Sequence, residues 1–205
     1  WNLSGAWNAH EENFFENLRP AFSHFTLKGS YSLTGDRGPS TVTNSYAVYR
    51  SYTPWRPTAG DAESGLEIAD LANNGLTYEK KHELNVGTSM GFLDNRINVE
   101  FDWFKRDNFD LIGIINTQGL GGQISKFGNV ADMKSHGAEL SLTGHIFRDQ
   151  AFKWISNFTY SNVKTKVTRL DTRTQVMDLI TGTGFALEGG PVRGLYSIPF
   201  VRLND

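Results

Sequence analysis

Apolar and polar residues alternate most regularly between Glu83 and Arg106, in two runs separated by Asp94-Asn95. Asp and Asn suit a two-residue turn because they tolerate positive φ. A turn centred on these two residues places Glu83 opposite Arg106 and keeps the two runs in phase. This pattern is typical of a β-hairpin with one apolar and one polar face. The apolar face carries Val86, Met90, Phe92, Ile97, Val99, Phe101 and Trp103, and the polar face carries Gly87, Ser89, Gly91, Asn98, Glu100 and Asp102.

A second hairpin is predicted from His136 to about Lys164, with its turn at Arg148-Asp149-Gln150. A three-residue turn there places Leu140 opposite Phe158 on an apolar face. The same turn places Glu139 opposite Thr159 on a polar face. The second hairpin therefore repeats the two-faced pattern of the first.

The rest of the chain divides into shorter strands and loops. Alternation predicts strands over residues 1–9 and 24–35, and the segment between them predicts a turn with one helical turn. Residues 40–74 and 108–134 read as long loops, with a short strand within 42–52. A last apolar run over 195–203 predicts one more strand.

Short turns alternate with long loops along this order of strands, which is typical of an outer-membrane barrel. A soluble β-sandwich also alternates apolar and polar faces. Its strands usually have about five or six residues, whereas the strand that ends at Phe92 extends back to Tyr78. We therefore predict an all-β fold, a segment of an antiparallel transmembrane β-barrel, in preference to a sandwich. Residues that suit aromatic girdles at the membrane interfaces are Trp103, Phe104, Trp154 and Tyr160.

Composition narrows the classes of function. The formal net charge of −2 offers no basic excess for nucleic acid. The absence of Cys excludes disulfides, thiolate catalysis and Cys-based metal sites. No apolar run approaches the roughly 20 residues of a membrane helix, which barrel strands do not need. Because the chain starts at Trp1 without Met, we expect a piece of a longer protein.

Residues that could carry chemistry are few. His10-Glu11 and His82-Glu83 begin like the zinc motif HExxH, but Phe14 and Val86 stand where the second His belongs. We expect no metal, no cofactor and no catalytic residue. Carboxylates on the polar strand faces could act as general acids or bases, but they also suit the water-filled lumen wall of a barrel. The residues assigned to that wall are Glu83, Glu100, Asp102 and Glu139.

Aromatic side chains gather in the first long loop. Flat rings with a polar edge often stack on sugars, so these residues are candidate substrate contacts. The alternative is a loop that packs on itself or on its neighbours. The candidates are Tyr49, Tyr52 and Trp55, close to Tyr46.

Seven segments of the chain carry recognisable motifs: residues 28–35, 69–80, the hairpin 84–112, 128–142, 152–154, 167–170 and 188–196. These segments resemble motifs of the SusC/RagA family of TonB-dependent outer-membrane transporters. Three departures are conservative: Asn74-Gly75 stands for Asn-Pro, Tyr78 for Trp, and Ser135-His136 for Asn-Lys.

The resemblance implies a barrel of about 22 strands filled by an N-terminal plug. Residues 1–205 are then a part of that barrel, without the plug and the final strand. The implied function is import of oligosaccharides or oligopeptides across the Gram-negative cell outer membrane, in contact with its lipid and without nucleic acid. The implied partners are a SusD-like surface lipoprotein and TonB. Two alternatives remain: a soluble β-sandwich binding module and an outer-membrane β-barrel enzyme.

Overall fold

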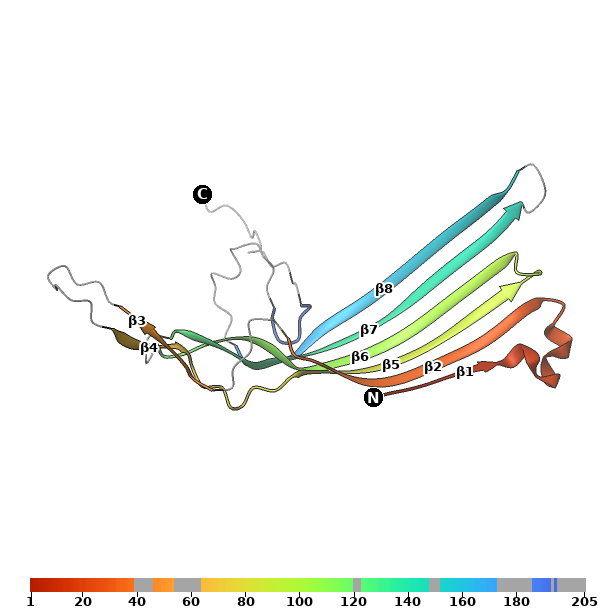
Figure 1. The fold of residues 1–205 in the computed structure, drawn as a ribbon. Helices are drawn as coiled ribbons and strands as arrows, with labels where there is room; N and C mark the ends of the chain where they lie inside the picture. Colours follow the sequence, from red (N-terminus) through yellow and green to blue (C-terminus); the bar gives the residue numbers. More distant parts are fainter. Residues whose placement is uncertain are drawn as a thin grey trace, which may run out of the picture. The chain divides into compact units, whose positions relative to one another are not determined.

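A computed structural model describes residues 1–38, 46–53, 64–119, 123–147, 152–172, 186–192 and 194. Six strands form one sheet in the order β1-β2-β5-β6-β7-β8, and β3 pairs with β4 (Figure 1). No helix in the described ranges is long and apolar enough to cross a membrane. The elements are β1 (Asn2–Asn8), the 3₁₀ helices η1 (Ala9–Glu11) and η2 (Asn13–Leu18), β2 (Phe22–Asp36), β3 (Val48–Tyr52), β4 (Gly65–Asp70), β5 (Glu79–Phe92), β6 (Ile97–Asn116), β7 (Ser125–Phe147) and β8 (Trp154–Leu170).

The strands of the large sheet are long. β5, β6, β7 and β8 have 14, 20, 23 and 17 residues. Strands of soluble sheets usually have about five or six residues, and a tilted transmembrane strand needs about 9–11. Their lengths therefore contradict the β-sandwich alternative and suit a barrel wall.

The chain forms two compact units, which we describe separately. The wall unit comprises Trp1–Thr34, Lys81–Asn108 and Met133–Lys166. The loop unit comprises Gly35–Lys80, Phe109–Asp132 and Val167–Asp205.

The predicted turn of the first hairpin is confirmed. Arg96 N–H donates to the Leu93 carbonyl at 3.1 Å, so Asp94 and Asn95 are the two central residues. Their φ values of 53° and 57° are both left-handed, as a type I′ turn requires. At the other end of the pairing, Arg106 Nε lies 3.0 Å from Glu83 Oε1. The alternation therefore predicted the register of this hairpin correctly.

The two faces of the wall unit differ as the alternation predicted. On the apolar face, Phe101 and Trp103 remain 40% and 38% exposed, and Phe158 and Tyr160 remain 54% and 52% exposed. This apolar surface has no partner among the residues that the structure describes.

Phe104 departs from the prediction of an aromatic girdle. It is only 2% exposed and lies on the polar face, against Gly137 of the next strand. The Arg106 guanidinium stacks over its ring at 4.1 Å from the centroid. The expected role at the membrane interface is therefore wrong for this residue, because glycine on the neighbouring strand leaves space for the ring.

The second hairpin keeps its predicted faces but not its predicted pairing. Ser161 Oγ donates to Glu139 Oε1 at 3.5 Å, two residues beyond the expected partner Thr159. A shift of two residues leaves each side chain on the same face. The predicted turn at residues 148–150 and the predicted strand at 195–203 lie outside the described residues.

The predicted loops are partly wrong. Residues 108–134 are mostly strand, because β6 continues to Asn116 and β7 begins at Ser125. The short strand expected within 42–52 is β3, but its partner β4 was not predicted. The expected helical turn between the first two strands is confirmed as η1 and η2.

Aromatic rings pack at the end of the wall unit that carries the short turns. Phe15 of η2 is 4% exposed and stacks on Phe25 of β2 with centroids 5.9 Å apart. Phe22 joins Phe15 to Phe92 of β5, at 5.6 and 4.6 Å. The cluster therefore packs the connection between β1 and β2 against the first hairpin.

We expect Gly137→Ala to destabilise the protein by about 1–3 kcal/mol, because the added methyl group overfills a packed site. That group would lie 2.6 Å from the Asn162 carbonyl oxygen and 2.7 Å from the Phe104 ring. Gly29→Ala is the matched control, since nothing lies within 4 Å of a methyl group there. Urea unfolding of the full-length protein in vesicles measures both. Equal unfolding midpoints for the two variants would contradict the close packing of Phe104.

Candidate functional site

Three of the four predicted wall carboxylates come together on the polar face. Glu100, Asp102 and Glu139 line one shallow hollow of about 330 Å³ in the wall unit. Asp102 lies over Gly87 of β5, which has no side chain to displace it. The hollow also presents hydroxyl groups from Ser141, Thr159 and Ser161. Such a lining offers hydrogen-bond acceptors to a cationic or hydroxyl-bearing group.

Glu83 lies apart from this hollow and already has basic partners. Its carboxylate is 2.9 Å from Lys81 Nζ and 3.0 Å from Arg106 Nε. The side chain of Glu83 is 18% exposed. Its role is therefore to balance charge within the sheet, and the structure does not place it with the other three carboxylates.

The residues that line the hollow show the geometry of neither a catalytic nor a metal site. Across the described ranges, no three His, Asp or Glu side chains are arranged to hold a metal ion. The hydroxyl groups that line the hollow have no His or Lys beside them in its lining to activate them as nucleophiles. The hollow is therefore suited to contact and solvation rather than to covalent chemistry.

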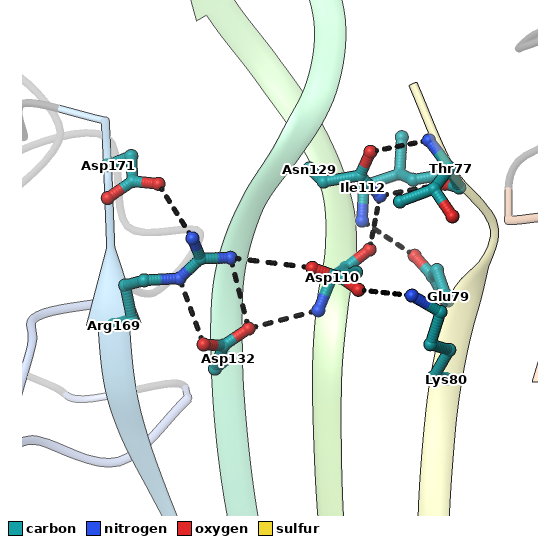
Figure 2. A network of polar contacts seen from close by, with 9 residues as sticks. All are labelled: Thr77, Glu79, Lys80, Asp110, Ile112, Asn129, Asp132, Arg169 and Asp171. Atoms are coloured by element: carbon teal, nitrogen blue, oxygen red, sulfur yellow. Dashed lines mark hydrogen bonds and ion pairs between the residues drawn. The ribbon is translucent and has the colours of Figure 1, made fainter. Parts of the chain in front are cut away.

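The loop unit contains a polar network centred on Asp110 of β6 (Figure 2). Asp110 has φ 58° in the middle of its strand, a left-handed conformation that Asp tolerates better than most residues. Its N–H donates to Asp132 Oδ1 at 3.0 Å, and its carboxylate accepts a 2.8 Å hydrogen bond from Lys80. Side chains of the neighbouring strands thus hold the backbone where its conformation departs from that of a strand.

Arg169 of β8 extends the network across the sheet. Its Nε lies 2.9 Å from Asp132 Oδ2, and its Nη1 lies 3.3 Å from Asp171 Oδ2. Its Nη2 also approaches Asp110 at 3.9 Å. The hydrogen bond to Asp132 raises the pKa of Arg169, and the hydrogen bond to Asp110 raises the pKa of Lys80. Each base is therefore held in its charged form by a carboxylate of an adjacent strand.

Asn129 of β7 binds the segment that leads into β5. Its Nδ2 donates to the Thr77 carbonyl at 2.8 Å and to the Asp110 carbonyl at 2.6 Å. Its Oδ1 accepts a 2.8 Å hydrogen bond from Thr77 N–H. Glu79 similarly accepts a 2.8 Å hydrogen bond from Ile112 N–H. Here side chains make the hydrogen bonds that the backbone of a neighbouring strand would otherwise make. The backbone N–H and C=O groups therefore remain paired where the chain departs from the sheet.

The motif at residues 188–196 also has a structural role where it is described. Val167 N–H donates to the Gly190 carbonyl, and Gly189 N–H donates to the Val167 carbonyl, both at 2.9 Å. Gly189 has φ 85°, which favours glycine. This segment therefore pairs with β8 inside the loop unit.

The candidate substrate contacts of the first loop lie on the β3–β4 hairpin or outside the described residues. Tyr49 and Tyr52 are 63% and 47% exposed, and Tyr46 before the hairpin is 80% exposed. Arg50 and Glu67 form an ion pair between the two strands. Trp55 lies outside the described residues. The two described tyrosines are therefore accessible, as a substrate contact requires.

Comparisons with known proteins identify the family of this sheet. The family model described as "TonB dependent receptor-like, beta-barrel" matches residues 1–199. The chain belongs to the TonB-dependent receptor β-barrel family. Its fold is therefore a segment of an antiparallel barrel.

Individual relatives agree with the resemblance to SusC/RagA transporters. TonB-dependent receptor P3 of Formosa agariphila is 26% identical over 80% of this chain and 16% of its own length. The TonB-dependent receptor SusC of Bacteroides thetaiotaomicron is 24% identical over 82% of this chain and 17% of its own. The RagAB peptide importer in its closed-closed state superposes with a TM-score of 0.70 and 25% identity, over 82% of this chain and 18% of that one. The chain thus spans less than a fifth of each relative.

No local pattern in the sequence indicates that the residues of this network lie together. Glu79, Lys80, Asp110 and Asn129 all lie in segments that carry the family resemblance. Glu79 and Lys80 lie at the start of β5, and Asp110 and Asn129 lie in the stretch 108–134 that the sequence predicts as loop. The signal for this network in the sequence is the group of charged and amide side chains within segments whose other residues suit a strand.

We expect Asn129→Asp to weaken the attachment of residues 73–80 by roughly 1–3 kcal/mol, because an acceptor then faces two carbonyl oxygens. Hydrogen exchange of the peptide that contains Thr77 should become at least about fivefold faster. Asn157→Asp makes the same chemical change at an exposed position of β8 and should leave this peptide unchanged. Unaltered exchange in Asn129→Asp would show that these hydrogen bonds do not hold the segment.

Proposed function

We propose that the protein is an outer-membrane TonB-dependent importer of nutrients, and that residues 1–205 form part of its barrel wall. The observation that carries this proposal is the match of the barrel family model over residues 1–199. Likeness to SusC and to a peptide importer supports oligosaccharides or oligopeptides as the substrate class. The relatives are receptors and transporters, so the proposed function is transport rather than catalysis.

The two faces of the wall unit support insertion in a membrane. Backbone groups in the bilayer core must be paired, which long strands in a closed barrel achieve. In this placement the segments 81–92, 97–108, 133–147 and 154–166 cross the membrane. Phe101, Trp103 and Phe158 then face lipid, and the opposite face lines the lumen. The exposed apolar surface of the isolated sheet gains its partner in this way.

The carboxylates of the hollow are proposed contacts for the plug. Glu100, Asp102 and Glu139 would accept hydrogen bonds from basic or hydroxyl groups of that domain, and Glu83 would keep the wall itself neutral. Tyr49, Tyr52 and Trp55 would contact substrate, because accessible rings offer flat apolar area with a polar edge. Substrate held between such loops and a SusD-like lipoprotein would be released when TonB remodels the plug.

Deletion of the gene tests this proposal most directly. Cells that lack the protein should lose growth on one defined oligopeptide or oligosaccharide mixture as sole nutrient, and the wild-type gene should restore it. The wild-type protein should also sediment with the outer-membrane fraction. Unchanged growth on both mixtures, with the protein absent from that fraction, would contradict the proposal.

Charge on the two faces should have unequal effects on insertion. We expect Val99→Arg to destabilise the inserted protein by about 2–4 kcal/mol, because the charge would enter the bilayer near its midplane. Glu100→Arg, at the next residue on the lumen face, is the matched control and should have a much smaller effect. A folding titration of the full-length protein into vesicles measures both, and equal losses would contradict the assignment of the faces.

A further inference from the structure

Basic side chains follow the apolar face of the wall unit at one end. We call Lys105 of β6, Lys134 of β7, and Lys164 and Lys166 of β8 the lysine row. All four are exposed, with side chains of Lys105 and Lys134 accessible to 53% and 61%. The row thus crosses three neighbouring strands of one compact unit.

The register places the whole row on one face. Lys105 and Lys134 both approach Asp107, at 4.0 and 3.9 Å. Thr165 accepts a hydrogen bond from Ser135 at 3.4 Å on the polar side. Since successive side chains of a strand point to opposite faces, its neighbours Lys164 and Lys166 point to the apolar side.

The charge of the row is largely unbalanced. Asp107 is shared by two of the lysines at distances near the limit of an ion pair. Within the ranges that the structure describes, no carboxylate lies within ion-pair distance of Lys164 or Lys166. A site with this excess of positive charge suits an anion.

The row lies about one bilayer thickness from the short turns. Lys105 follows Ile97 by eight positions, and Lys164 follows Trp154 by ten. At a rise of about 3.3 Å per residue and a tilt of about 40°, these spans correspond to roughly 20–25 Å across the membrane. The apolar band of a barrel is about 25 Å tall, and its short turns face the periplasm. In the proposed membrane placement, Lys105 and Lys164 therefore lie near the outer-leaflet edge of the apolar band, and Lys134 and Lys166 lie just beyond it.

We propose that the lysine row binds the phosphate-bearing headgroups of lipids in the outer leaflet. Ammonium groups are compact charges that suit phosphate oxygens, and basic clusters beside a bilayer attract anionic lipids. The exposed apolar side chains Trp103 and Tyr160 precede the row along β6 and β8, where acyl chains would lie. This amphipathic surface favours a lipid over a free anion. The inference rests on the proposed insertion in the outer membrane.

Lipid binding to purified full-length protein in non-ionic detergent tests this site separately from transport. The probes are bisphosphorylated lipid A and the same lipid after enzymatic removal of its phosphates, with bound molecules counted by native mass spectrometry. We expect Lys134→Gln/Lys164→Gln/Lys166→Gln to bind the phosphorylated lipid at least tenfold more weakly, on the order of fivefold per lysine. Binding of the dephosphorylated lipid should not change.

Two further variants make the outcome decisive. Lys28→Gln/Arg37→Gln/Lys153→Gln removes the same charge at exposed positions outside the row and should bind like wild type. Lys134→Arg/Lys164→Arg/Lys166→Arg keeps the charge and should restore binding. Equal binding by wild type and the row variant, equal loss in the control variant, or displacement of lipid A by inorganic phosphate at the same concentration would each overturn the proposal. Because uptake is not measured, failure here is distinguishable from failure of the proposed function.

Discussion

Continuous backbone pairing between long antiparallel strands is the constraint on which this structure depends. The lipid core contains no water that could form hydrogen bonds with backbone N–H and C=O groups. In a strand that crosses lipid, each of these groups must therefore be paired by a neighbouring strand. Strands β5 to β8, with 14 to 23 residues, satisfy this requirement over more than the thickness of a bilayer. Once the backbone is paired in this way, side-chain alternation assigns one face of the wall unit to apolar surroundings and the other to polar ones. The type I′ turn at Asp94-Asn95 keeps the two sides of the first hairpin in phase.

Where the backbone departs from regular strand geometry, side chains take over the pairing. Asp110 has a left-handed backbone within β6, and its N–H and carbonyl groups bond to Asp132 and Asn129. Asn129 also pairs both backbone groups of Thr77. Several of the segments that resemble the SusC/RagA family therefore have a structural explanation in the loop unit. Their residues hold the backbone of the extended strands, and nothing in their contacts requires them to touch a substrate.

The faces of the wall unit carry different parts of the proposed transport function. On the lumen side, small residues such as Gly87 and Gly137 allow Asp102 and Phe104 to lie flat across a neighbouring strand. This packing leaves a shallow carboxylate- and hydroxyl-lined hollow rather than a catalytic pocket. On the apolar side, exposed rings are followed by the lysine row at the end away from the short turns. With the proposed insertion and lipid binding, one sheet presents a water-facing wall, an acyl-chain surface and an anion-binding margin, each determined by position along strands of alternating pattern.

The sequence by itself determined the fold class, the first hairpin with its register, and the apolar and polar faces of both hairpins. Period-two alternation and turn chemistry are local properties, so they can be read from neighbouring residues. Only the tertiary structure decided that β6 and β7 continue through residues that the sequence predicts as loop, and that Phe104 is buried on the polar face. It also grouped Glu100, Asp102 and Glu139 in one hollow while leaving Glu83 with Lys81 and Arg106. These outcomes depend on which side chain of a neighbouring strand lies opposite, as Gly137 does for Phe104 and Asn129 for Thr77. That information belongs to pairs of residues far apart in the chain, and no local pattern contains it.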